Sequence, residues 1–190
     1  GLTHDSPLIG NWEALRWGMI GLAIKGGVWI GFAGLFLGIG LGGKRYRPFE
    51  MFLLMLGMLM AVVAGWWLFN SPHDPENQRL PFFYFSDHWQ WEPGVELKHR
   101  PEIWGGLLAA LGSGILYAGL AKRDRLARNL ALWGMLGGAL GFPLGQALQA
   151  SNAWNPGMYN DSFVGFFTKS FNWWNIMETT SGTVMGAVLG

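Results

Sequence analysis

The feature that most constrains this fold is an uncharged stretch, residues 133–150, with regularly spaced glycines. Gly137, Gly141 and Gly145 stand four residues apart. That spacing is just over one helical turn, so on a helix they share one face and form a groove. In water each glycine weakens a helix by about 1 kcal/mol relative to alanine, but in a bilayer small residues let another helix approach closely. The stretch therefore predicts a membrane-embedded helix packed against a neighbour.

Other apolar runs of similar length indicate an all-α, polytopic integral membrane bundle. A helix needs about 20 apolar residues to cross the hydrocarbon core. Only 13% of the 190 residues are charged, about half the fraction in ordinary soluble domains. We predict a single transmembrane domain over residues 1–190 with at least five spans, and we expect it to be a piece of a longer chain. The predicted spans are residues 17–43, 51–69, 103–121, 130–150 and 176–190.

Small residues recur at four-residue spacing in all five predicted spans. One such series could arise by chance among 30 glycines, but five favour tight small-xxx-small packing between helices. The first two spans and the next two each enclose a basic turn, which suggests repeated helical hairpins. Besides the series in residues 133–150, the small residues are Gly34, Gly38, Gly42; Gly57, Ala61, Gly65; Gly106, Ala110, Gly114, Ala118; and Gly182, Gly186, Gly190.

The distribution of basic residues predicts the orientation in the membrane. Residues 44–49 and 122–129 are rich in Lys and Arg, so we expect both turns in the cytoplasm. Residues 70–102 and 151–175 then lie outside. We expect a bacterial inner (cytoplasmic) membrane protein. Its expected partners are the lipid bilayer and either other membrane subunits or the rest of a longer chain, and no nucleic acid.

Aromatic residues are concentrated in the two outer segments. The runs LPFFYFSDHWQWEP and FVGFFTKSFNWW hold more aromatic side chains than the usual interfacial belt of a membrane protein. They suggest short amphipathic helices or lids over the bundle. The alternative is stacking against sugar rings or another flat ligand, because aromatic faces offer a large rigid apolar area.

Polar side chains within the apolar runs are candidates for a binding site, because burying them in a membrane is costly. They fall at similar depth on several helices, which predicts an outward-facing polar pocket with Lys25 at its floor. The alternative is a hydrogen-bond network that holds the bundle together. Pro143 is a candidate hinge, since proline frees a backbone carbonyl in a membrane helix. The candidate substrate- or ion-binding residues are Lys25, Gln146, Gln149, Glu178, Glu102 and Arg16.

Metal and cofactor chemistry has little support in the sequence. His73, His88 and His99 lie in one outer segment but lack the close spacing of metal ligands, so we expect no metal. The chain has no cysteine, which excludes disulfides and thiolate sites. No phosphate-binding loop, dinucleotide motif or nucleophile elbow is present, and no cofactor is indicated.

Three functions remain after these exclusions. The first is a permease-like or substrate-binding membrane protein that uses the outward-facing pocket. The second is a membrane-embedded enzyme acting at the outer face on a glycan or lipid-linked substrate, with Glu178, Glu102 or His99 as acid or base. The third is a structural or assembly subunit of a membrane complex. Transport requires a water-filled path past Lys25, whereas an outer-face enzyme requires none.

Overall fold

A computed structural model describes residues 9–74, 77, 102–168 and 170–189. These residues form helices and no strand, in agreement with the predicted all-helical class. The elements are α1 (Trp12–Leu41), α2 (Pro48–Phe69), α3 (Trp104–Leu116), the π-helical turn η2 (Tyr117–Ala121), α4 (Arg125–Trp154), α5 (Phe163–Thr168) and α6 (Trp173–Leu189).

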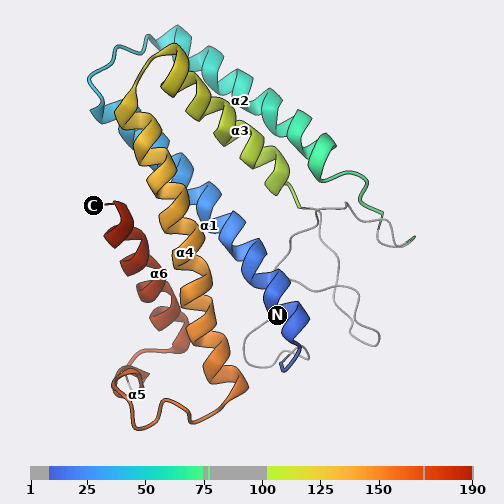
Figure 1. Cartoon of the computed structure of the whole chain (residues 1–190), viewed down its shortest axis with the longest axis vertical. Helices are drawn as coiled ribbons and strands as arrows, with labels where there is room; N and C mark the ends of the chain where they lie inside the picture. Colours follow the sequence, from blue (N-terminus) through green and yellow to red (C-terminus); the bar gives the residue numbers. More distant parts are fainter. Residues whose placement is uncertain (1–8, 75–76, 78–101, 169, 190) are drawn as a thin grey trace.

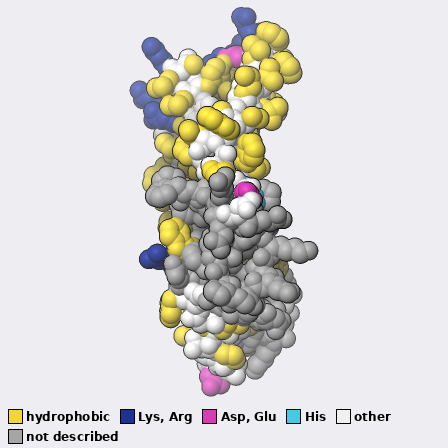
Figure 2. All heavy atoms as spheres, turned by 90° about the vertical axis from the view of Figure 1, so that its right-hand side faces the viewer, with side chains coloured by type: hydrophobic (Ala, Val, Ile, Leu, Met, Phe, Trp, Pro, Cys, Tyr) yellow, Lys and Arg dark blue, Asp and Glu magenta, His cyan; other side chains and the backbone are white. Residues whose placement is uncertain are grey.

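In chain order the long helices run alternately up and down (Figure 1). Across the molecule they follow one another as α2, α3, α1, α4 and α6, so that the neighbours α3 and α1 run in the same direction (Figure 1). The α1–α4 contact is the most extensive, α6 packs on α4, and α2 pairs with α3. The turn from α1 to α2 and the turn from η2 to α4 lie together at the upper end in Figure 1. Figure 2 shows Lys and Arg side chains gathered at this end, which we call the basic end.

Length and hydropathy identify three helices that could cross a membrane among the described residues: Leu15–Leu41, Pro48–Phe69 and Trp104–Ala121. They coincide with the first three predicted spans. The apolar part of α4 contains glycines, a proline and two glutamines, which lower its hydropathy. Helix α6 has 17 residues, fewer than the roughly 20 that a span requires.

Helices α1 and α4 approach so closely that facing glycines leave no room for a side chain. A Cβ added at Gly26 would overlap the carbonyl oxygen of Gly138 and lie 2.8 Å from its carbonyl carbon. A Cβ at Gly138 would in turn overlap the carbonyl oxygen of Gly26. The two backbones are therefore in direct contact, which only glycine permits.

Helix α6 packs on α4 through a face that the glycine spacing did not predict. Gly141 and Gly145 of α4 contact Ser181 and its neighbours on α6. By contrast, a Cβ at Gly182 or Gly186 would meet no atom within 4 Å. Consecutive helix residues point about 100° apart, so the face with Ser181 turns these two glycines away from α4. At Gly182 and Gly186 the predicted close packing is absent within the described part of the chain.

Asn70 joins the end of α2 to the start of α3. Its side chain is 4% exposed, and its Oδ1 accepts a hydrogen bond from the backbone N–H of Gly105 at 2.9 Å. The first N–H groups of a helix have no partner within the helix, so Asn70 satisfies one of them for α3.

Asn70→Ala is expected to lower the free energy of unfolding by about 1–3 kcal/mol, because the Gly105 N–H would be left buried without its acceptor. Denaturant titration of the purified protein in detergent measures this change. Asn129→Ala on the exposed surface of α4 is the control and should stay within about 0.5 kcal/mol of wild type. Equal effects of the two substitutions would contradict this role.

Candidate functional site

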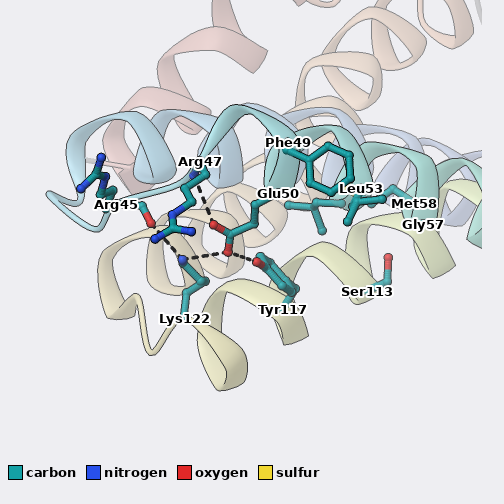
Figure 3. A pocket seen from close by; sticks show the side chains of 11 residues that line it. Arg45, Arg47, Phe49, Glu50, Leu53, Gly57, Met58, Ser113, Tyr117 and Lys122 are labelled. Carbon is teal, nitrogen blue, oxygen red and sulfur yellow. Dashed lines mark hydrogen bonds and ion pairs between the residues drawn. The ribbon is translucent and has the colours of Figure 1, made fainter.

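An open groove of about 890 Å³ lies between α2 and α3 at the basic end (Figure 3). One part of the groove is polar and charged, and the rest is apolar. The polar part consists of Arg45, Arg47, Glu50, Ser113, Tyr117 and Lys122, and the apolar part of Phe49, Leu53, Leu54, Gly57 and Met58.

Glu50 is the centre of a polar network in this groove (Figure 3). Its Oε1 lies 2.8 Å from the Lys122 Nζ and also accepts a hydrogen bond from the Tyr117 hydroxyl. Its Oε2 accepts from the backbone N–H of Arg47 at 3.2 Å. Lys122 also donates to the carbonyl oxygen of Arg45 at 2.8 Å. The network therefore joins the start of α2 to the end of η2 and fixes the Lys122 ammonium group.

A second polar pair lies beside this network, outside the apolar helices. The Tyr46 hydroxyl donates to Asp124 Oδ2 at 3.1 Å, and Asp124 is 2% exposed. Asp124 also caps the start of α4, because its Oδ1 accepts from the backbone N–H of Ala127 at 3.0 Å. Burial and the hydrogen bond to Asp124 raise the pKa of Tyr46 well above its usual value, so the phenol keeps the proton that it donates.

The basic residues of these two turns predicted the orientation in the membrane, but the Glu50 network and the Asp124 pair were not predicted. Local signals were present. Pro48 is favoured in a first helical turn, and Glu50 follows at the third position, where an acid stabilises a helix start. Asp124 directly precedes a helical run, which is the usual place of a capping residue.

At the opposite end, a pocket of about 530 Å³ lies between the end of α4 and the start of α6. Gln149 is 3% exposed, and its Oε1 accepts from Gln146 Nε2 at 3.3 Å. Asn172 caps the start of α6, since its Oδ1 accepts from the backbone N–H of Asn175 at 2.9 Å. We call this the amide–tryptophan pocket; it is lined by Gln149, Asn152, Ala153, Thr168, Phe171, Asn172, Trp173 and Trp174.

A smaller, mainly apolar pocket of about 410 Å³ adjoins it and shares Phe171. Phenylalanines of α5 line this second pocket, and the rings of Phe163 and Phe167 pack edge to face with centroids 4.8 Å apart. The described part of the predicted outer segment 151–175 thus contains the end of α4, the short helix α5 and the start of α6, and its residues line part of both pockets. The other aromatic run, in residues 80–93, lies outside the described residues.

Of the six candidate binding residues, the structure shows a direct hydrogen bond between Gln146 and Gln149. Only Gln149 lines the amide–tryptophan pocket. The Lys25 ammonium lies over the Trp104 ring, 5.3 Å from its centroid, between α1 and α3. Glu178 is exposed on α6 and is not among the residues that line the pocket.

The remaining candidates lie elsewhere on the molecule. The Arg16 guanidinium is exposed over the Trp17 ring, 5.2 Å from its centroid. Glu102 is 4% exposed, just before α3. Helix α4 continues through the candidate hinge Pro143.

The histidines are only partly described. His73 is half-buried after α2, whereas His88 and His99 lie outside the described residues. Within the described ranges no three His, Asp or Glu side chains come close enough to hold a metal ion.

Comparison with family models, with curated proteins and with solved structures gave no match. The amide–tryptophan pocket offers neutral hydrogen-bond donors and acceptors beside flat apolar rings, a combination suited to binding an uncharged polar molecule.

Proposed function

We propose that this chain is a polytopic membrane protein that binds an uncharged, hydroxyl-rich ligand, such as a sugar, in the amide–tryptophan pocket. The main support for this proposal is that one pocket is lined by two indole rings and by three amide side chains, those of Gln149, Asn152 and Asn172. Each amide both donates and accepts hydrogen bonds, as a hydroxyl group does. Indole faces offer rigid apolar area to the ring face of a sugar. The proposed role is permease-like or substrate-binding.

The proposal includes an orientation. We infer at least five spans with small-residue packing, so that α4 and α6 also cross the membrane. The alternating direction of the helices supports this inference, and so does the collection of basic side chains at one end. With the basic end in the cytoplasm of a bacterial inner membrane, the amide–tryptophan pocket opens to the outside.

Binding is favoured over catalysis at this pocket. Its described lining contains no carboxylate and no histidine, the side chains that most often act as general acid or base. Glu178 and Glu102 do not line it either. An outer-face enzyme acting on glycans would require an acid or base that does not line this pocket.

The absence of cysteine allows a direct test with a single introduced thiol. Ala153 lines the pocket, so Ala153→Cys is expected to react with a membrane-impermeant maleimide added from outside. Maltose or N-acetylglucosamine should slow this labelling, whereas glutamate and lysine should not. Trp174→Ala in the Ala153→Cys background should weaken the sugar protection about fivefold, because one aromatic face is worth about 1 kcal/mol.

Trp133→Ala is the matched control, because Trp133 is exposed on α4 to a similar extent as Trp174 and does not line the pocket. Lys25→Cys distinguishes transport from binding alone. Labelling of this cysteine from outside would support a transport path, and a lack of labelling would support binding alone. The proposed ligand class would be refuted if sugars gave no protection from labelling. It would also be refuted if Trp133→Ala weakened that protection as much as Trp174→Ala does. A structural or assembly subunit would show that result.

A further inference from the structure

The groove at the basic end combines an excess of positive charge with an apolar floor. Three cationic residues and one acidic residue line it, an excess of two positive charges. We propose that this groove binds an anionic phospholipid of the adjacent leaflet, with the phosphate at Arg45 and Arg47 and one acyl chain along α2. This site is independent of the amide–tryptophan pocket, since it lies at the opposite end and takes a charged amphiphile.

The positive charge available to a ligand comes from the arginines. The Glu50 carboxylate is already occupied by Lys122, by the Tyr117 hydroxyl and by the backbone N–H of Arg47. Arg45 and Arg47 are exposed, and their guanidinium groups form no ion pair within the described ranges. Guanidinium groups bind phosphate with paired hydrogen bonds. A phosphate is thus the complementary group at this end of the groove.

The apolar part of the groove begins directly beyond the charged part. Leu53, Gly57 and Met58 follow Glu50 along one side of α2 (Figure 3). Gly57 lies seven residues from Glu50, or about 10 Å along the helix axis. A Cβ added at Gly57 would meet no atom within 4 Å, so the groove is open beside this glycine. We call this apolar part of the groove the furrow. Positive charge at the membrane surface with an apolar furrow below it matches a phospholipid whose headgroup is at the surface and whose acyl chains extend into the leaflet.

The experiment uses the full chain in detergent, titrated with phosphatidylglycerol or with phosphatidylcholine and observed by native mass spectrometry. Wild type is expected to bind phosphatidylglycerol in preference to phosphatidylcholine. The double variant Arg45→Ala/Arg47→Ala should lose about thirtyfold in affinity for phosphatidylglycerol, since each basic residue near a membrane surface contributes about one factor of five. Binding of phosphatidylcholine should hardly change.

Lys44→Ala/Arg125→Ala is the charge control, because it removes two exposed cations at the same end that do not line the groove. Gly57→Leu tests the acyl-chain furrow by filling it and is expected to weaken phosphatidylglycerol binding at least fivefold. Gly182→Leu, at another helical glycine in open space, should leave binding unchanged. Equal losses in the two charge variants would overturn the proposal, and so would full binding by a folded Gly57→Leu protein. If Gly57→Leu fails to fold, the comparison of the two charge variants alone decides, because the four basic residues that these variants replace are all exposed.

Discussion

Gly26→Ala is expected to lower the free energy of unfolding by about 3 kcal/mol, although it adds a single methyl group. The added Cβ would overlap the Gly138 carbonyl oxygen and lie 2.8 Å from the ring carbon Cδ2 of Phe142. The first obstacle is backbone, which cannot rotate away as a side chain can, so α1 and α4 would have to separate. Overpacking of this kind costs about 1–3 kcal/mol and occasionally more. Because α1–α4 is the largest helix contact, we expect the upper part of that range.

Gly40→Ala is the control for this prediction. Gly40 belongs to the same helix, but a Cβ there would meet no atom within 4 Å. Its replacement by alanine should leave stability unchanged or slightly raised, because alanine favours helix. Both variants are compared by thermal unfolding and denaturant titration in the same detergent. Similar stabilities for the two variants would show that α1 and α4 are not in backbone contact at Gly26.

Asp124→Ala is the second substitution with a large expected effect, a loss of about 2–3 kcal/mol. The buried carboxylate caps α4 through the Ala127 N–H and accepts from the Tyr46 hydroxyl. Loss of a cap costs about 1 kcal/mol, and a partly buried hydroxyl without its partner adds about 1–2 kcal/mol. The carboxylate also fills the space beside Gly42, where a Cβ would lie 2.7 Å from Asp124 Oδ2.

Asp124→Asn keeps an acceptor oxygen and should lose only about 1 kcal/mol. A double-mutant cycle of Asp124→Ala with Tyr46→Phe isolates the hydrogen bond between the two side chains. We expect a coupling energy of about 1 kcal/mol. A coupling near zero, measured by the same denaturant titrations, would mean that Tyr46 contributes nothing through Asp124.

The sequence was most informative about the helices, because apolar length and charge content are properties of a continuous segment. The first three predicted spans are confirmed as helices long and apolar enough to cross a membrane. Helix ends beyond the apolar part were not predicted: the predicted span covers residues 130–150, whereas α4 extends from Arg125 to Trp154. Asp124 caps the first turn of α4, which contains polar residues. A criterion based on the length of an apolar run does not detect such a cap.

Contacts between helices could not be predicted from the sequence to the same extent. Tyr46 and Asp124 are 78 residues apart, and Glu50 and Tyr117 are 67 residues apart. Such pairs depend on how the two hairpins are placed, which no local spacing encodes. The face of α6 is a similar case: Gly182 lies in a regular series, yet α4 packs against the neighbouring face with Ser181. Gln149 was identified as a candidate, but its aromatic neighbours in the pocket were not paired with it.

The lengths of α1 and α4 have a consequence for the amide–tryptophan pocket. Each helix has 30 residues and is therefore about 45 Å long, whereas the hydrocarbon core of a bilayer is about 30 Å thick. If α4 spans the membrane together with α1, as proposed, this pair must tilt or extend beyond the acyl chains. A thicker bilayer immerses the end of α4 more deeply, and a thinner one raises it into the headgroup layer. Membrane thickness would thus control how readily the proposed water-borne ligand reaches the pocket.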